Sequence, residues 1–576
     1  MTENNPILKS AQEWEFKPFK LETGLDRIVA YGDESGKCPT YVERTPPCSD
    51  GCPAGEDIRG YHNIIRGIWK AEDPWTAAFD RLTKTNPFPA VMGRVCPAPC
   101  ESACNRQYRD ETVGINAVEQ AIGDYAQEKE LALPTPPEST GKRVVIVGSG
   151  PAGLSCAYQL RMQGHSVTIL ERDPKLGGMM RYGIMGYRVS RKVLDQEIKR
   201  ILDLDVEVKT GVKVGEDVSL EDLREQYDAV FLAVGAQKGR GIPIPGADGA
   251  NVTNAIEFLR SYELDKDNHH VGKHVVVIGD GDVAMDAARL ALRRGSKATL
   301  LCGVAREEMN ASQIEFDEAL AEGTDMKFQT GSVEVIRDAA GNMTGIKCIG
   351  MVRKEKGEDG FNHKIPFMRY KPEAGSEFEF EADMLVAAIG QTTDMTGLDA
   401  ATNNTPSLAV DYNMQVKGME DVFGGGDAVQ ISLLTTAIGH GRKAAENIGL
   451  FLDNKPLPKR SRAEIVKYDK LKSDFFVQQD SPKRNLRHID KVEGDWDETL
   501  VALSREDATK QSDRCMSCGM CFECNQCMLF CPQEAIVKFR DNPEGEVMFT
   551  EYDRCIGCHI CSEVCPTGYI DMGMGA

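Results

Sequence analysis

No apolar run in the 576-residue sequence approaches the roughly 18 residues that a membrane-spanning helix needs. The first residues, MTENNPILKSAQEWEF, also lack the basic start, the apolar stretch and the small-residue cleavage site of an export signal. Hydrophobic residues make up 41% of the chain and charged residues 27%, the balance of an ordinary globular protein. We therefore expect a cytoplasmic protein without a membrane span.

Positive charge is scarce as well. The chain has 68 lysines and arginines against 89 acidic residues, which gives a net charge of −21 at pH 7. Proteins that bind nucleic acids or anionic membranes need basic patches to meet phosphates. The charge balance therefore argues against those partners and suits a protein partner with a basic docking face.

The chain is too long for one hydrophobic core, and three or four domains are expected. It contains 19 cysteines, which gather mainly at its two ends. Disulfides are not expected in a reducing cytosol, so clustered cysteines indicate metal sites.

One cysteine motif occurs twice near the C-terminal end. Each copy spaces its cysteines x2, x2 and x3 and is followed by a proline. In two-cluster ferredoxins the first three thiolates of each run hold one 4Fe-4S cluster and the fourth ligates the other. Cys565 should therefore complete the first cluster and Cys531 the second. The predicted ligands are Cys521, Cys524, Cys527, Cys531, Cys555, Cys558, Cys561 and Cys565.

Zinc sites are the alternative for these cysteines, but tetrahedral zinc does not need the x3-Cys-Pro tail. Cys515 and Cys518 precede the first run at the same x2 spacing. They exceed what two clusters need, and we expect ordinary thiols near a cluster rather than a third metal site.

A nucleotide-binding motif begins at residue 148. GSGPAG follows the strand-like RVVIV and begins a helix. Gly148 would allow the turn, Gly150 would let the backbone approach a pyrophosphate, and Gly153 would let the helix pack closely. Glu171 ends the next strand and can bind ribose hydroxyls. The predicted FAD site comprises Gly148, Gly150, Pro151, Ala152, Gly153 and Glu171, with Gly178, Arg181 and Gly390 as further cofactor-binding residues.

A second FAD segment is VFGGGDAVQ, which places Gly426 and Asp427 before a helix-like stretch. The Asp427 carboxylate could meet a ribityl hydroxyl of FAD. On composition alone it could equally cap the start of the helix.

The motif GDGDVA, between the two FAD segments, indicates a nicotinamide cofactor. Its predicted binding residues are Gly279, Gly281, Asp282, Val283 and Ala284. The next strand ends in Cys302, Gly303 and Val304, whose apolar side chains cannot grip a 2′-phosphate. We therefore favour NADH over NADPH, although Arg306 could still hold that phosphate.

Flavin disulfide reductases need a redox-active cysteine pair, and the segment RDPKLGGMMRYGIMGYR contains no cysteine. Cys156 stands alone on a helix and is expected in the core. Thiol exchange is therefore not expected.

We predict a multidomain protein. Its predicted parts are an N-terminal α-helical iron-sulfur domain at 1–135, a Rossmann-like α/β FAD-binding domain at 141–240 and 385–455, a second Rossmann-like domain for NAD(P)H inserted at 241–384, a surface connector at 456–511, and a ferredoxin-like α+β domain with two 4Fe-4S clusters at 512–576.

Residues 40–455 resemble the glutamate synthase small-subunit family of flavoproteins. The resemblance is carried by PPCSDGCPAG, GRVCPAPCESACNR, GSGPAG, LGGMMRYGI, GDGDVAMD, REEMNAS and GGGDA. With the ferredoxin tail, the chain looks most like the sulfite-reductase-linked NADH:acceptor oxidoreductases of sulfur-metabolising prokaryotes. Where the family often has two arginines for NADPH, this chain has Gly303 and Val304.

The resemblance implies iron-sulfur clusters in the N-terminal domain. One 4Fe-4S cluster would use Cys52, Cys96, Cys100 and the carboxylate of Glu119, unless Glu119 is an exposed helical residue. A second would use Cys48 and Cys104, but only Cys38 stands upstream in place of the closely spaced pair of the family. With three cysteines this second site is a ligand short.

The expected function is NAD(P)H:acceptor electron transfer through FAD and the clusters, without a catalytic side chain, because hydride passes between cofactors. The acceptor would be a redox protein, with dissimilatory sulfite reductase as the candidate that the resemblance implies. Alternatives are the electron-input small subunit of a glutamate synthase or 2-oxoacid oxidoreductase, and a non-catalytic assembly subunit. A homodimer is compatible with the sequence.

Overall fold

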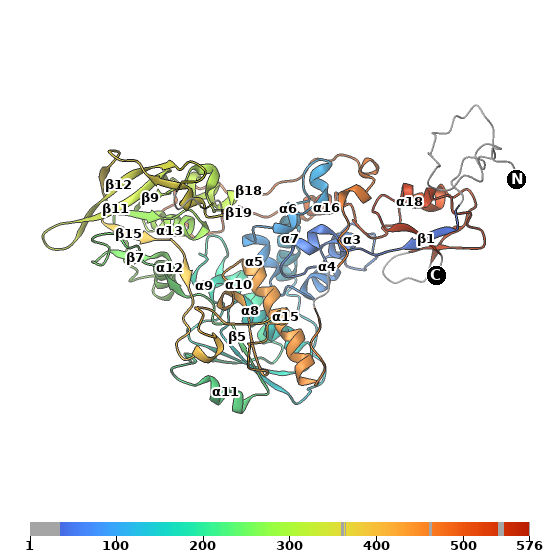
Figure 1. Ribbon diagram of the computed structural model, residues 1–576, viewed down its shortest axis with the longest axis horizontal. Helices are drawn as coiled ribbons and strands as arrows, with labels where there is room; N and C mark the ends of the chain where they lie inside the picture. Colours follow the sequence, from blue (N-terminus) through green and yellow to red (C-terminus); the bar gives the residue numbers. More distant parts are fainter. Residues whose placement is uncertain (1–34, 359–361, 363, 460–462, 540–546, 575–576) are drawn as a thin grey trace.

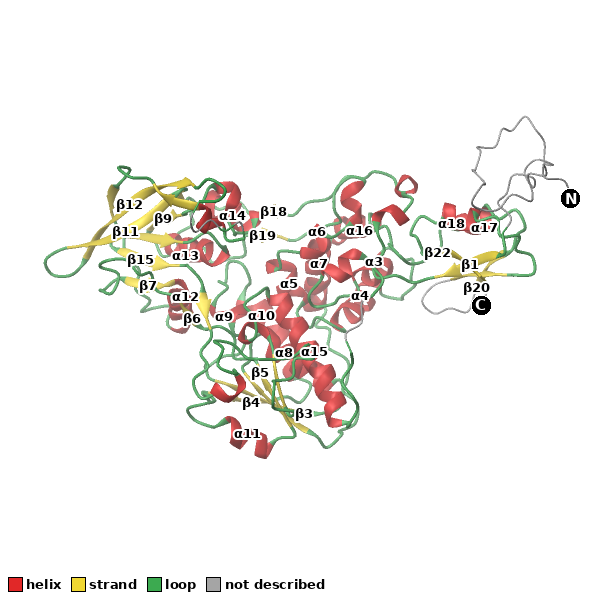
Figure 2. Ribbon diagram, viewed as in Figure 1, coloured by secondary structure: helices red, strands yellow, loops and turns green. Residues whose placement is uncertain are grey.

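The computed structural model describes residues 35–574 apart from 359–361, 363, 460–462 and 540–546. The start of the chain, where an export signal was not expected, lies outside the described residues. A helical domain lies at the centre of the molecule, with the NAD(P)H domain at one end, the ferredoxin-like domain at the opposite end and the FAD domain below the centre in this view (Figure 1). Strands concentrate in the outer domains and helices in the centre (Figure 2).

The FAD domain is built on a five-stranded parallel sheet in the order β17-β5-β2-β3-β4. Its central strands are apolar and almost fully buried, as expected for a sheet covered on both faces. The strands are β2 (Arg143–Val147), β3 (Ser166–Glu171), β4 (Glu207–Thr210), β5 (Ala229–Leu232) and β17 (Val422–Gly424), and the helices are α8 (Pro151–Arg161), α9 (Met179–Tyr182), α10 (Arg191–Leu202), α11 (Leu220–Gln226) and α15 (Leu434–Leu452). β17 pairs with β5 although the inserted domain separates the two strands in the sequence.

The inserted domain has its own five-stranded parallel sheet, β10-β9-β8-β15-β7, and an antiparallel sheet beside it. The parallel strands are β7 (Val252–Asn254), β8 (His274–Ile278), β9 (Lys297–Leu301), β10 (Asp325–Lys327) and β15 (Met384–Ala387), the antiparallel strands are β11 (Thr330–Arg337), β12 (Met343–Arg353), β13 (Tyr370–Pro372) and β14 (Phe378–Glu381), and the helices are α12 (Ala255–Leu264), α13 (Asp282–Arg293) and α14 (Gln313–Ala321). The expected boundary at 384/385 differs from the structure, because β15 pairs with β7 and β8 and belongs to this domain. The short strands β6 (Lys238–Gly239) and β16 (Gln391–Thr392) pair at the crossing between the domains.

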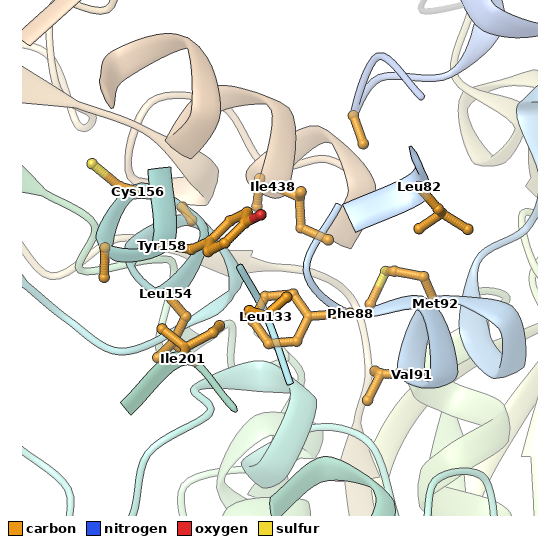
Figure 3. Packing of buried hydrophobic residues seen from close by; sticks show 14 of the residues in the cluster. Leu82, Phe88, Val91, Met92, Leu133, Leu154, Cys156, Tyr158, Ile201 and Ile438 are labelled. Atoms are coloured by element: carbon orange, nitrogen blue, oxygen red, sulfur yellow. The ribbon is translucent and has the colours of Figure 1, made fainter. Parts of the chain in front are cut away.

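The helical domain shares one hydrophobic core with the FAD domain. Figure 3 shows Phe88 and Met92 of the helical domain packed toward Leu154 and Tyr158 of α8. The helices are α2 (Pro47–Gly51), α3 (Ile58–Ile65), α4 (Pro74–Thr83), α5 (Pro89–Val95), α6 (Pro99–Ser102) and α7 (Ile115–Glu128). A continuous core fixes the helical domain relative to the flavin-binding sheet.

The two ends of the chain exchange segments between domains. β1 (Lys37–Tyr41) leaves the helical domain and pairs antiparallel with β22 (Ile570–Met574) of the ferredoxin-like domain. In return, α16 (Arg505–Asp513) packs on α3 and α7 of the helical domain. The ferredoxin-like domain also contains α17 (Gln526–Leu529), β20 (Ile536–Phe539), β21 (Val547–Thr550) and α18 (Ile560–Val564).

The segment expected to be a surface connector, 456–511, makes specific contacts instead. Arg484 donates to the Gly93 carbonyl and to the side chains of Asn116 and Gln120. The segment also contains β18 (Asn485–Leu486), β19 (Leu500–Val501) and the start of α16. Periodicity could not reveal these contacts because single long side chains make them. No helix in the described ranges is both long and apolar enough to cross a membrane.

Candidate functional site

A hollow of about 990 Å³ lies at the carboxyl ends of the FAD-domain strands. Of the predicted residues, Gly148, Gly150, Pro151, Ala152, Glu171, Gly178, Gly426 and Asp427 line it. The turn between β2 and α8 and the start of α15 therefore meet at one site although they are far apart in the sequence. This is where open α/β sheets bind nucleotides.

Three glycines shape this hollow. Gly148 has a φ of +100°, and a Cβ there would lie 2.5 Å from the Ala233 carbonyl oxygen. A Cβ on Gly153 would lie 2.0 Å from the Gly148 carbonyl oxygen, and one on Gly178 would lie 2.7 Å from the Gly150 Cα. The backbone is thus open where a pyrophosphate has to approach, and the residues present fit FAD.

Glu171 lies at the end of β3 beside the turn. It accepts hydrogen bonds from the Ser149 amide at 2.9 Å, from the Ser149 hydroxyl at 2.5 Å and from the Asp173 amide at 2.8 Å. These bonds hold the glycine turn and orient the carboxylate toward the hollow. Burial raises the pKa of Asp427, whose carboxylate accepts from the Ser432 amide at 3.1 Å.

Arg181 and Gly390 are not among the residues that line this hollow. Arg181 is buried, pairs with Asp195 and donates to the Leu176 carbonyl. It therefore holds the loop around Gly178 in place. Gly390 has a φ of +107°, and its carbonyl accepts from the Arg240 amide at 3.0 Å at the crossing between the two domains.

The predicted nicotinamide residues lie where β8 ends and α13 begins. A Cβ on Gly279 would lie 2.5 Å from the Ala388 carbonyl oxygen, so glycine permits this turn. The other residues of this motif, Gly281, Asp282, Val283 and Ala284, begin α13. The Asp282 carboxylate accepts from the Ser312 amide at 2.7 Å and ties the turn to α14.

At the tip of β9 the ring of Phe367 covers Gly303, where a Cβ would lie 2.5 Å from Phe367 Cε2. Val304 is buried. The Arg306 guanidinium stacks 4.6 Å from the centre of the Phe316 ring.

Cys52 and Cys96, which directly follow α2 and α5, come together in the helical domain with Cys100 of α6 and Glu119 of α7. Burial and then the Glu119 carboxylate raise the pKa of Cys96 to about 12. Glu119 is 5% exposed, so it is not the exposed helical carboxylate that was the alternative.

Glu56 lies beside Glu119. Sequence reasoning did not identify Glu56 as part of this site. Asn86 Nδ2 donates to an oxygen of each carboxyl at 2.9 Å. Burial raises the pKa of Glu56 to about 7. Its place four residues after Cys52 was the available signal, but α2 ends before Cys52 and breaks the helical period.

The Tyr61 hydroxyl, which also faces these groups, is buried without a hydrogen-bond partner in the described part of the chain. Three thiols, a carboxyl and an unsatisfied hydroxyl fit an iron-sulfur cluster, because thiolates suit iron and buried polar groups need partners.

Two hollows in the ferredoxin-like domain are each lined by four cysteines. One, of about 320 Å³, is lined by Cys521, Cys524, Cys527 and Cys565. The other, of about 330 Å³, is lined by Cys531, Cys555, Cys558 and Cys561. The fourth cysteine of each run lies with the first three of the other, as a two-cluster ferredoxin requires.

Cys38 does not lie with Cys48 and Cys104, contrary to expectation. It lies in β1 opposite Gly573. Burial, followed by a hydrogen bond with Cys555, raises the pKa of Cys38. The pairing of β1 with β22 places it there.

Cys48 and Cys104 instead line a third hollow, of about 380 Å³, together with Cys515 and Cys518. The latter pair was expected to be ordinary thiols near a ferredoxin cluster. Cys515 and Cys518 lie shortly after α16, which packs on the helical domain and so places both thiols there. No local sequence pattern indicated this packing.

Within the described ranges, no three histidine, cysteine or acidic side chains lie close enough together to hold a single metal ion. A cubane cluster spaces its thiolates more widely than one ion does. Cys156 is fully buried in α8, as expected for a core residue.

Three family models match the chain. The pyridine nucleotide-disulphide oxidoreductase model matches residues 142–441, the 4Fe-4S cluster domain II of dihydropyrimidine dehydrogenase matches 27–131, and the 4Fe-4S dicluster domain matches 520–569.

Several relatives are about one third identical. The NADPH-Fe(3+) oxidoreductase subunit beta of Geobacter sulfurreducens is 32% identical over 526 residues, covering 82% of this chain and 75% of the relative. The glutamate synthase [NADPH] small chain of Bacillus subtilis is 34% identical over 440 residues, covering 70% and 86%. The NADP(+)-dependent formate dehydrogenase subunit beta of Moorella thermoacetica is 33% identical over 436 residues, covering 71% and 60%.

Proposed function

The chain belongs to the glutamate synthase small-chain-like family of NAD(P)H-dependent flavin and iron-sulfur oxidoreductases, and we propose that it passes electrons from NADH through FAD and 4Fe-4S clusters to a redox protein partner. The family model over the two nucleotide domains and the two cluster models account for FAD, a nicotinamide nucleotide and 4Fe-4S clusters.

One observation carries the proposed route from the flavin to the first cluster. α15 contributes Leu434 and Ala437 to the flavin hollow, and between them Thr435 contacts Cys96, with 3.9 Å from Sγ to Oγ1. The same helix packs so closely on the loop after Cys52 that a Cβ on Gly439 would lie 2.0 Å from the Pro53 carbonyl oxygen. The flavin site and the site of Cys52, Cys96, Cys100 and Glu119 thus share one helix.

When bound, FAD would supply a two-electron acceptor for hydride from the nicotinamide, and the clusters would supply one-electron carriers. The residues of this chain would bind and orient these groups. Glu171 and the glycine turn would hold the nucleotide end of FAD, and Thr435 links the helix that lines the flavin hollow to the Cys96 thiol. No side-chain acid or base is needed.

The preference for NADH is supported by the strand tip, where Val304 is buried and Phe367 covers Gly303. In the segment 302–308 after β9, Arg306 is the basic residue that could meet a 2′-phosphate, and its guanidinium stacks on Phe316. The relatives named above include NADPH-linked proteins, so the nucleotide choice needs a direct test.

For the acceptor we propose dissimilatory sulfite reductase, on the strength of the domain order and of the ferredoxin tail. The net charge of −21 suits a partner with a basic docking face. The second candidate is the electron-input subunit of a glutamate synthase or 2-oxoacid oxidoreductase, which the coverage of 86% of a glutamate synthase small chain favours. We also propose that the protein is cytoplasmic and forms a homodimer.

A reconstituted assay separates these acceptors. The anaerobic protein is mixed with NADH and either a dissimilatory sulfite reductase or the large chain of a glutamate synthase with its substrates. We expect NADH oxidation to depend on the sulfite reductase and to fall as salt rises, because charge steers the docking. Turnover with the glutamate synthase chain alone would favour the second candidate, and turnover with neither would reject both acceptors.

A further inference from the structure

A fourth cysteine site lies where the two ends of the chain meet. Its hollow is lined by Cys48 and Cys104 from the helical domain and by Cys515 and Cys518 from the segment after α16. Its volume of about 380 Å³ is close to the 320 and 330 Å³ of the two ferredoxin-type hollows, each of which is also lined by four cysteines. The same set of four cysteines in all three hollows points to one kind of occupant.

The thiols of this hollow face one another. Burial, followed by the thiols of Cys104, Cys515 and Cys518, raises the pKa of Cys48. The Cys518 thiol also accepts a hydrogen bond from Asn105 Nδ2 at 3.8 Å. Four thiols held together in a buried place are a poor arrangement for free cysteines and a good one for metal.

Cationic side chains of the α3 region hold the Cys515–Cys518 segment in position. Arg59 donates to the Cys518 carbonyl at 2.9 Å and Arg66 donates to the Cys515 carbonyl. The Arg66 guanidinium also interacts electrostatically with the Cys515 and Cys518 thiols. The segment is therefore built to present its pair of thiols to this hollow.

A buried nitrogen in the same hollow lacks a partner. His62 is 1% exposed and lines the hollow, and its Nδ1 lies 3.0 Å from the Ser512 hydroxyl. Its Nε2 has no hydrogen-bond partner in the described part of the chain. A buried imidazole nitrogen needs one, and the sulfur of a bound cluster could provide it.

We infer that Cys48, Cys104, Cys515 and Cys518 together ligate a 4Fe-4S cluster that joins the helical domain to the ferredoxin-like domain. Two helices fix its place. Cys48 lies in α2, and Cys52 is the first residue after this helix. Cys100 lies in α6, and Cys104 is the second residue after that helix. The two helices pack so closely that a Cβ on Gly51 would lie 2.9 Å from the Ala103 Cβ.

This position makes the new site a link in a series. Cys52 of the neighbouring site follows Cys48 by four residues, and Cys521 of the ferredoxin-type sites follows Cys518 by three residues. Three residues span at most about 11 Å. Each electron that arrives from the helical domain leaves to the ferredoxin-like domain, so iron is reduced and reoxidised while no bond or proton changes. This role rests on the proposed function.

The test compares the double variant Cys515→Ser, Cys518→Ser with Cys348→Ala, which removes a buried cysteine far from every cluster site. Iron, zinc and flavin per chain are measured after anaerobic purification, together with the electron paramagnetic resonance spectrum of the dithionite-reduced protein. We expect about 16 irons per chain in the wild type, as four 4Fe-4S clusters require, and about 12 in the double variant. Flavin content should be unchanged in both variants.

Cys48→Ser gives an independent check, because the same signal and the same amount of iron should be lost from the opposite end of the chain. About 12 irons in the wild type, equal iron in all variants, or a zinc ion lost with the cysteines would each overturn the site. If the double variant loses its flavin through misfolding, the wild-type iron count and Cys48→Ser decide. Bleaching of the flavin by NADH is measured separately, so failure of the proposed function is distinguishable from failure of this site.

Discussion

Gly148 shows how a single residue controls flavin binding. Its φ of +100° is a conformation that L side chains rarely adopt, and a Cβ would lie 2.5 Å from the Ala233 carbonyl oxygen. We expect Gly148→Ala to purify with little flavin, measured as the flavin released per chain after acid denaturation and removal of the protein. Gly186→Ala, where a Cβ has open space, should keep its flavin. Full flavin in Gly148→Ala would show that the turn does not hold the pyrophosphate.

Arg306 gives a test of the nicotinamide preference at one side chain. The guanidinium stacks on Phe316, so it contributes to packing in the present conformation. We expect Arg306→Ala to change kcat/KM for NADH by less than about 3-fold, and to lower kcat/KM for NADPH by about 10-fold if it meets the 2′-phosphate. Steady-state rates with a ferricyanide acceptor measure both. A wild-type kcat/KM that is higher for NADPH than for NADH would contradict the preference.

Sequence reasoning was strongest where spacing alone defines the chemistry and weakest where the partner comes from elsewhere in the chain. The glycine turn and the two ferredoxin motifs are local patterns, and their residues line the expected hollows. Cys38 was assigned to the wrong place, because strand pairing with β22 carries it to Cys555. Cys515 and Cys518 were interpreted as ordinary thiols and Glu56 was missed, because tertiary contacts bring these residues to their sites.

Among the elements, α13 of the NAD(P)H domain depends on buried charge. Arg289 is fully buried and donates to Glu315 at 3.0 Å and to Glu322 at 2.7 Å. Arg289→Met would remove the cation that pairs with Glu318, while Glu315 keeps Arg188 and Glu322 keeps Arg293. Breaking a buried ion pair typically costs about 3–5 kcal/mol. We expect a lower thermal unfolding midpoint and faster proteolysis of this domain. Arg294→Met, at an exposed position at the end of the same helix, should behave as the wild type; equal loss in both variants would contradict this role.

Glu197 couples helix α5 to pH. Its carboxylate accepts from the Ala90 amide at 2.8 Å and from the Val91 amide at 3.0 Å, and burial raises its pKa to about 7 from an ordinary value of 4.5. Between these values the folded protein keeps a proton that the unfolded chain releases. Its contribution to stability is therefore largest below pH 4.5 and falls as pH rises to about 7.

Glu197→Gln should remove this dependence. We measure the unfolding midpoint by flavin release and subtract the value of the variant from that of the wild type. We expect this difference to be more positive at pH 5.5 than at pH 8, because the wild type loses stability as Glu197 ionises. The exposed Glu225→Gln serves as the control. A difference that grows with pH would show that the carboxylate is ionised in the folded state throughout.

The elements of both parallel sheets followed from β-branched runs alternating with helices, and the FAD domain does receive β17 from beyond the insertion. The boundary at 384/385 was wrong because β15 is a short buried strand whose sheet cannot be identified from its own residues. The contacts of Arg484 in the expected connector depend on single side chains, which leave no periodic pattern.

At the scale of the whole molecule, the exchange of end segments explains why the chain carries cluster ligands at both ends. β1 completes the ferredoxin-like domain and α16 completes the helical domain. Removal of the C-terminal segment would therefore disturb the N-terminal cluster sites as well. The core shared between the helical and FAD domains keeps the first cluster site against the flavin hollow.

Anaerobic titration with NADH, followed by visible absorbance and electron paramagnetic resonance, tests the central claim most directly. We predict that NADH bleaches the flavin and that cluster signals then appear, in a protein with about 16 irons per chain. If neither NADH nor NADPH bleaches the flavin, electron input from a nicotinamide is rejected and the chain would be a cluster-carrying subunit of another assembly. If the flavin bleaches while every cluster stays oxidised, the relay through the helical domain is contradicted.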